Sequence, residues 1–251
     1  MKWAPWVVLL SLSIGCESLE PRESDVVPRD SLPLVDQVLD LAVDHYGGRE
    51  WLRSLEGTTR SGAGRYLPDF LGRPGPHTVR FSLELSFDGH LKERIEYPDV
   101  PTVIEAELTE AGGRQTVNET LSQPVSKQDA EERLRKAQLS HPVTALRYFF
   151  ERRARLDEPE LLDLVLGRNA WRLQLEEDVE RSAFLWLDPT DGRVLRVEYS
   201  VRTQSWGGGR FDIEFPQEAL QDGVPGPPKV FTYRDGERIQ EVTYEDVTWR
   251  R

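Results

Sequence analysis

The sequence predicts an α+β protein in which a strongly curved antiparallel sheet carries its helices on one face. Two observations predict this fold. Apolar and polar residues alternate over many short segments, and pairs such as Asp-Gly separate several of them. The segments follow the order helix, about four strands, helices and about six strands, without the strand-helix alternation that builds a parallel sheet.

Helices are predicted where apolar residues recur at helical spacing between end signals. Pro33 suits a first helical turn and Gly47-Gly48 suits a stop, so the first helix lies between them. Pro142 divides the central helical region, and we interpret Gly167 as the stop of a last short helix. The predicted helices cover residues 34–46, 50–55, 127–139, 142–155 and 159–166.

Strands are predicted from a period of two, which places apolar side chains on one face of a sheet. The pairs Asp88-Gly89, Asp191-Gly192 and Asp235-Gly236 are favoured hairpin turns between such segments. The first strand begins at Gly57, and the others cover residues 79–87, 91–97, 102–109, 171–176, 181–187, 194–201, 210–215, 229–233 and 238–249.

The N-terminal residues have the organisation of a signal peptide. Lys2 supplies a positive charge, residues 6–12 an apolar run too short to span a bilayer as a helix, and Gly15 a small residue before a cleavage point. Cys16, the only cysteine, follows directly. Residues 12–16 resemble the lipobox of bacterial lipoproteins, in which this cysteine becomes the first residue and carries the acyl chains. The alternative is an ordinary secretory signal with an incidental cysteine.

Three parts are therefore expected: a lipoprotein signal peptide over residues 1–15, a lipidated flexible tether over residues 16–31, and a single domain over residues 32–251. Acyl chains on Cys16 would attach the mature protein to a membrane. The formal net charge of −12 opposes electrostatic attraction to nucleic acid, so we expect no nucleic-acid partner.

The residues that usually carry catalysis or bind metals are scattered. His45, His77, His90 and His141 do not form a metal-ligand spacing, and no second cysteine is available. The sequence also lacks the Gly-x-Ser-x-Gly and Ser-x-x-Lys signatures of serine enzymes. We therefore expect no catalytic residue, no metal and no cofactor, and an enzyme is the least supported class of function.

Two regions resemble the periplasmic proteins related to LolA and LolB, the carriers that sort lipoproteins to the bacterial outer membrane. Residues 38–55 are similar to the family's opening helix, Gly-Gly pair and following leucine, and residues 185–196, 222–224 and 233–237 are similar to its C-terminal strands and turns. The resemblance implies an incomplete barrel of about 10–11 strands wrapped around plugging helices, with an apolar cavity for acyl chains. Glu17 after Cys16 implies sorting to the outer membrane, with the domain facing the periplasm.

The candidate ligand-binding wall consists of apolar residues on one face of the strands: Phe81, Leu83, Leu85, Phe87, Ile95, Tyr97, Leu185, Leu187, Phe211, Ile213 and Phe215. The alternative is that these side chains only pack on the helices. Leu67, Phe70 and Leu71 lie among prolines and glycines in the loop from Tyr66 to His77. They are candidates for contact with lipid or a partner, and the alternative is a local lid on the core.

Binding of a hydrophobic ligand is the favoured function. An acyl chain, a lipid or the lipid moiety of a lipoprotein would lie between the sheet and the helices. Since a protein anchored through Cys16 cannot shuttle, it would act as a stationary acceptor or chaperone. The alternative is a non-catalytic envelope scaffold or protein-interaction module with no lipid ligand. The sequence does not predict the oligomeric state.

Overall fold

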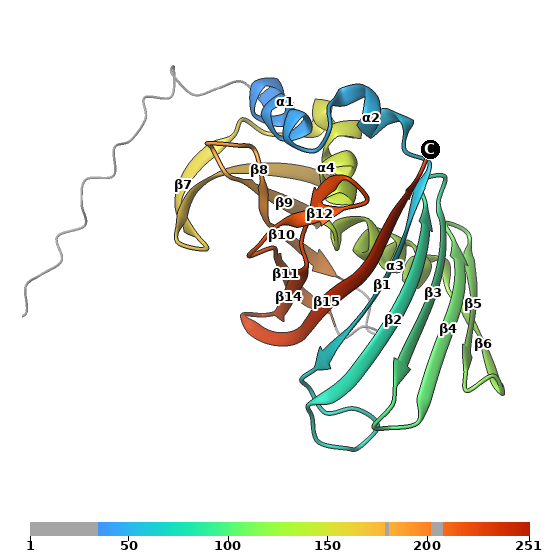
Figure 1. Cartoon of the computed structure of the whole chain (residues 1–251). Coiled ribbons are helices and arrows are strands. Elements are labelled where there is room, and N and C mark those ends of the chain that lie inside the picture. The colour runs from blue at the N-terminus through green and yellow to red at the C-terminus, as the bar shows by residue number, and fades with distance from the viewer. Residues whose placement is uncertain (1–34, 179–180, 202–207) are drawn as a thin grey trace, which may run out of the picture. The chain divides into compact units, whose positions relative to one another are not determined.

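A computed structural model describes residues 35–178, 181–201 and 208–251, about half of which belong to one antiparallel sheet (Figure 1). Cys16, the signal peptide and the tether lie outside the described residues. The sheet has 13 strands in the order β6-β5-β4-β3-β2-β1-β15-β14-β11-β10-β9-β8-β7. The predicted α+β class and curved antiparallel sheet are confirmed, with a few more strands than the sequence indicated.

The strands of this sheet, in chain order, are β1 (Gly57–Tyr66), β2 (His77–Ser86), β3 (His90–Tyr97), β4 (Thr102–Thr109), β5 (Gly112–Val117), β6 (Leu121–Val125), β7 (Glu160–Val165), β8 (Arg168–Asp178), β9 (Arg181–Leu187), β10 (Val194–Val201), β11 (Gly209–Glu214), β14 (Lys229–Arg234) and β15 (Glu237–Arg250). Two short strands, β12 (Ala219–Gln221) and β13 (Val224–Gly226), form a separate hairpin.

The pairing of β1 with β15 joins the first half of the sheet to the last strand of the chain. The pair runs from Gly57 opposite Arg250 to Tyr66 opposite Gln240, with a bulge between Ser61 and Gly62. Backbone atoms of β15 lie so close to Gly64 that a Cβ there would collide with them. Bulges and glycines of this kind let a strand bend and a neighbouring backbone approach closely. The bulge and the glycine therefore allow the sheet to bend where β1 meets β15.

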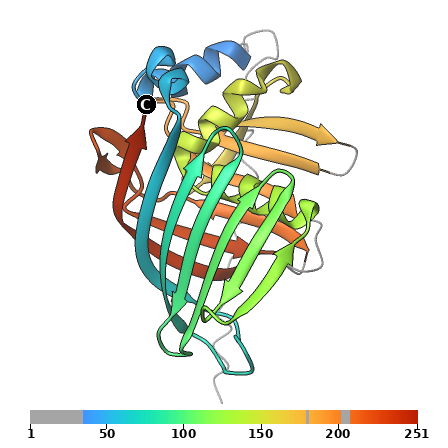
Figure 2. The same ribbon diagram turned by 90° about the vertical axis from the view of Figure 1, so that its right-hand side faces the viewer.

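Two helices fill the concave side of the sheet, α3 (Lys127–Leu139) and α4 (Pro142–Glu151) (Figures 1 and 2). α3 contacts β2 to β5, and α4 contacts β9 and β10. Ser126 caps α3, since its Oγ accepts a hydrogen bond from the Asp129 N–H at 3.1 Å. Eight of the ten residues of α4 are buried. The sequence predicted both helices, although α4 ends at Glu151 and a 3₁₀ turn over Arg153–Arg155 follows it.

The break between α3 and α4 is fixed by His141, which is fully buried. Its Nδ1 accepts a hydrogen bond from the Val143 N–H at 3.3 Å, so Nε2 carries the proton and donates it to Gln221 Oε1 at 3.2 Å. Gln221 belongs to the β12-β13 hairpin and donates from Nε2 to Pro227 O at 2.9 Å. The neutral imidazole therefore connects the two central helices to the small hairpin.

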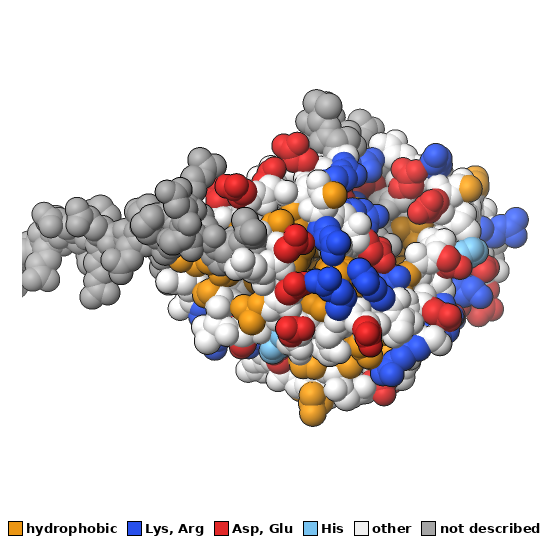
Figure 3. Space-filling view, turned by 90° about the horizontal axis from the view of Figure 1, so that it is seen from above, with side chains coloured by type: hydrophobic (Ala, Val, Ile, Leu, Met, Phe, Trp, Pro, Cys, Tyr) orange, Lys and Arg blue, Asp and Glu red, His pale blue; other side chains and the backbone are white. Residues whose placement is uncertain are grey.

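The first two helices, α1 (Val35–His45) and α2 (Arg49–Ser54), lie at the upper end of the molecule in Figure 1. Tyr46, just after α1, donates from its hydroxyl to Glu218 Oε1 at 2.8 Å and accepts from the Val194 N–H at 3.1 Å. Viewed from this end, Lys and Arg side chains gather near the middle, with Asp and Glu around them and hydrophobic side chains between (Figure 3). The buried Tyr46 thus fastens α1 to β10 beneath a surface of mixed character.

The predicted helix over residues 159–166 is wrong, because this segment forms strand β7. Val165 pairs with Arg168, which leaves Leu166 and Gly167 as a two-residue turn with φ of 51° and 76°. Positive φ at both central residues defines the type I′ turn that joins two antiparallel strands. Gly167 would be equally favourable at the C-terminal end of a helix, and for that reason the sequence pattern did not distinguish a helix from a strand followed by a turn.

The order of strands leaves β6 and β7 at the two ends of the sheet. β6 is a short strand of 5 residues and contains Pro124. Proline has no N–H to donate and is found in sheets mainly on edge strands. The sheet is open, and Pro124 lies on one of its edges.

We predict that His45 and His141 titrate on opposite sides of the usual histidine pKa of 6.5. The hydrogen bond to Glu218 raises the pKa of His45, and burial together with the nearby Arg60 lowers the pKa of His141 to about 3. NMR titration of the imidazole resonances measures both directly. A His141 signal that titrates near pH 6.5 in the folded protein would contradict the buried, neutral assignment.

The two shifts have opposite effects on stability. The contribution of His45 is fully present below pH 6.5 and is lost as the pH rises through its raised pKa. The unfolded chain takes up a proton at His141 below pH 6.5 while the folded chain does not, so stability is lost as the pH falls from 6.5 toward 3. Denaturant unfolding at several pH values measures this loss, which His141→Gln should reduce.

Candidate functional site

A cavity of about 560 Å³ lies between α3 and the concave face of the sheet. This volume falls within the range of about 300–1,000 Å³ that is typical of small-molecule sites. Strands β1 to β6 line one side, β11, β14 and β15 line the other, and α3 contributes residues along its length. The apolar and aromatic lining residues are Tyr66, Phe70, Val79, Phe81, Leu83, Ile95, Tyr97, Ile104, Val125, Ile213, Val230, Val242 and Tyr244.

Five of the eleven predicted wall residues line this cavity: Phe81, Leu83, Ile95, Tyr97 and Ile213. Val79, Phe81 and Leu83 share one face of β2, as the period of two requires. α3 does not fill the space over this part of the strand, and side chains that would otherwise pack on a helix line open volume there. The cavity therefore results from the position of the helix above an ordinary apolar sheet face.

The other six predicted wall residues lie outside the cavity lining. Leu85 is fully buried in a cluster with Leu91, Leu108 and Leu134 of α3, and Phe87 packs against that cluster. The remaining four are buried in the core: Leu185, Leu187, Phe211 and Phe215. These six side chains pack against helices or within the core, and they do not form part of the ligand wall that the sequence suggested.

Between the end of β1 and the start of β2, residues 67–76 contribute one residue to the cavity. Phe70 lines it and stacks on Tyr97, with ring centroids 4.2 Å apart. Burial raises the pKa of Tyr97 to about 12. Leu67 is half-buried outside the lining, and Leu71 is 66% exposed. Phe70 thus covers one end of the cavity, and Leu71 is the exposed apolar residue of the loop.

Two solved structures share the fold of this chain over most of their length. A putative outer membrane lipoprotein-sorting protein domain from Vibrio parahaemolyticus matches with a TM-score of 0.51 and 12% identity, over 86% of this chain and 93% of the other. A LolA superfamily protein from Nitrosomonas europaea matches with a TM-score of 0.51 and 12% identity, over 87% and 94%. The chain has a LolA-like fold. By sequence, it matches no protein-family model and no curated protein.

The LolA-like fold of this chain encloses polar residues that the sequence analysis missed. Arg60 of β1 and Arg133 and Lys136 of α3 line the cavity together with its apolar residues. Burial lowers the pKa of Arg133 to about 10, and burial and Arg133 together lower the pKa of Lys136 to about 8. Arg60 lies on the buried face of β1 together with Thr58 and Gly62, as the period of two requires. A charged residue at such an inward-facing position is the sequence signal that points to this site.

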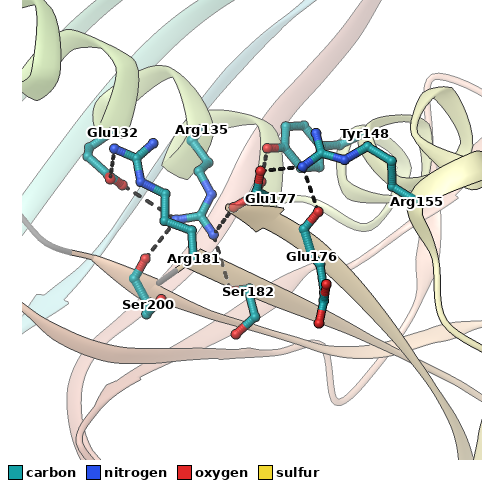
Figure 4. Close-up of polar contacts among 9 residues, drawn as sticks. All are labelled: Glu132, Arg135, Tyr148, Arg155, Glu176, Glu177, Arg181, Ser182 and Ser200. Carbon is teal, nitrogen blue, oxygen red and sulfur yellow. Dashed lines mark hydrogen bonds and ion pairs between the residues drawn. The ribbon is translucent and has the colours of Figure 1, made fainter. Parts of the chain in front are cut away.

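The opposite side of α3 is held to the C-terminal strands by a buried network of charges (Figure 4). Arg135 donates to Ser200 O at 2.7 Å and Ser182 O at 3.3 Å, and its Nη2 lies 2.5 Å from Glu177 Oε2. Arg181 pairs with Glu132 at 3.3 Å. α3 is therefore fastened on one side to β8, β9 and β10 while its other side faces the cavity.

Neither a metal cluster nor a membrane-spanning helix is found in the part of the chain that the structure describes. No group of three or more His, Cys, Asp or Glu side chains there is arranged to hold a metal ion. No described helix is long and apolar enough to cross a membrane.

We predict that Arg135→Met lowers the free energy of unfolding by about 3 kcal/mol, because it removes the cation that pairs with the buried Glu177 and one of the two cations that pair with Glu132. Lys127→Met on the same helix is the control, since Lys127 and Glu131 form an exposed pair at 3.6 Å. The control should change stability by about 0.5 kcal/mol or less. Urea unfolding measures both, and equal effects would show that the network does not hold α3.

Proposed function

We propose that the protein binds the acyl chain of a lipid or lipoprotein in the cavity between α3 and the sheet. The observation that carries the proposal is a cavity of about 560 Å³ in which aliphatic and aromatic residues make up just over half of the lining and polar or charged residues most of the rest. An apolar wall with a few polar groups is the usual composition of a small-molecule site. The LolA-like fold supports the same class of ligand, since one structure that shares it is described as a lipoprotein-sorting domain.

The hydrophobic effect supplies enough free energy for such binding. Each methylene removed from water contributes about 0.8 kcal/mol, so an apolar stretch of about ten methylenes makes about 8 kcal/mol available. Part of this is offset by the loss of motion of the ligand. No catalytic group is needed, and the proposed activity is holding a chain away from water.

The predicted anchor determines how the binding is used. With acyl chains on Cys16, the domain would remain at the periplasmic face of the outer membrane, as Glu17 after the cysteine implies. A domain held there receives or protects a ligand at one place. We therefore propose a stationary acceptor or chaperone.

The cavity proposal predicts that Ile104→Trp abolishes ligand binding, because the larger ring occupies volume that the acyl chain needs. Ile104 lines the cavity from β4. Glu107→Trp is the matched control, since Glu107 is an exposed residue of the same strand with its side chain on the other face. Native mass spectrometry after gentle extraction should show bound lipid on the wild type and the control only.

Two results would contradict the proposal. The wild-type protein could stay empty with every lipid offered, or Ile104→Trp could bind as much lipid as the control. The first result, together with a stable protein partner in a pull-down, would favour the scaffold function instead.

The anchor proposal predicts that Cys16→Ser releases the protein from membranes. Fractionation of cells that produce the two forms measures this, with the wild type in the membrane pellet and the variant in the soluble fraction. Ser13→Ala is the control, because it changes a neighbouring residue and keeps the cysteine. If Cys16→Ser still sediments with membranes, attachment does not depend on acylation of this residue.

A further inference from the structure

Arg60 is a buried charge in the wall of the cavity, with 1% of its surface exposed. Its Nη2 donates to Ala137 O at 2.7 Å and its Nη1 donates to Ser140 Oγ at 3.2 Å. The third donor, Nε, is buried and has no hydrogen-bond partner. Among the residues that the structure describes, no carboxylate lies within ion-pair distance of Arg60. Its charge is therefore solvated by neutral groups only.

The other arginine of the cavity has a different environment. Arg133 forms a buried ion pair with Glu93 and donates to Gln115 Oε1 at 2.8 Å. Since that pair is neutral as a whole, Arg60 is the one of the two cavity-lining arginines that has no carboxylate partner among the described residues. Burial lowers its pKa, and its charge helps to lower the pKa of His141. A buried charge without a counterion is costly, and an anion that reached it would be bound favourably.

We infer that Arg60 binds the anionic group of the ligand, a carboxylate or phosphate carried on an apolar chain. This rests on the proposed function and names the chemical class of its ligand. The guanidinium group presents its donors in a planar fork that suits the oxygens of carboxylates and phosphates. The apolar walls formed by Phe81, Leu83 and Ile213 accommodate the chain. An anionic amphiphile satisfies both parts of the cavity at once.

The negative net charge of the protein allows a specific anion site to be distinguished from general electrostatic attraction. With a formal net charge of −12, the protein repels anions in general. A preference for a charged over a neutral amphiphile of the same chain length must then come from a local cation. A role of Arg60 limited to fastening Ala137 and Ser140 to β1 produces no such preference.

The experiment is a competition between hexadecanoate and hexadecanol for the mature full-length protein, read by native mass spectrometry. The wild type should favour the acid by about tenfold or more, the effect of a hydrogen bond to a charged group. Arg60→Gln should remove the preference and keep alcohol binding, and Arg60→Lys should retain part of it. Ser140→Ala is the matched control and should keep the wild-type ratio, because it removes one neutral partner of Arg60.

Further probes distinguish the sources of the anion. Hexadecyl phosphate should also displace hexadecanol, whereas inorganic phosphate alone should not. Equal binding of acid and alcohol by the wild type would overturn this inference and leave the proposed function intact, even if Arg60→Gln fails to fold. If neither amphiphile binds, the proposed function fails as well. Tight binding of inorganic phosphate alone would overturn the assignment to an amphiphile.

Discussion

The pairing of β1 with β15 is the constraint on which the other features depend. It brings residues 57–66 against residues 240–250 and makes one sheet from two groups of strands that are far apart in the sequence. Gly64 permits the close approach of the two backbones. Once the sheet curves at this pair, its concave face is apolar and must be covered. α3 and α4 cover it, and the volume they leave is the cavity.

α3 is suited to this position because its faces differ. Ala130, Leu134 and Ala137 pack against β2 to β4, and Glu132 and Arg135 join the buried charges above β8 to β10. Apolar packing on one side of α3 and ion pairs on another fix the distance between this helix and the concave face of the sheet. The size of the cavity depends on this distance, because strands of the sheet form its other sides.

Local patterns predicted most of the fold and only part of the site. Alternation and turn pairs placed most strands, and Pro142 correctly divided the central helices. Gly167 was misread because a helix stop and a type I′ turn both favour glycine there. Leu83 and Leu85 lie on the same face of β2, yet Leu85 is fully buried under α3 whereas Leu83 packs only partly against the same cluster and also lines the cavity. Only the tertiary position of the helix separates them. Arg60 was overlooked because a charged residue in a strand is usually assigned to the solvent face.

Within the residues that the structure describes, the open sheet ends at β6 and β7, and exposed sheet edges can recruit strands from other molecules. Pro124 on β6 removes one of the donors that an incoming strand would need, and the strand is only 5 residues long. These features discourage aggregation along that edge. If the proposed anchor at Cys16 holds the protein on a membrane surface, neighbouring copies meet often, and such protection matters more than for a protein that diffuses freely.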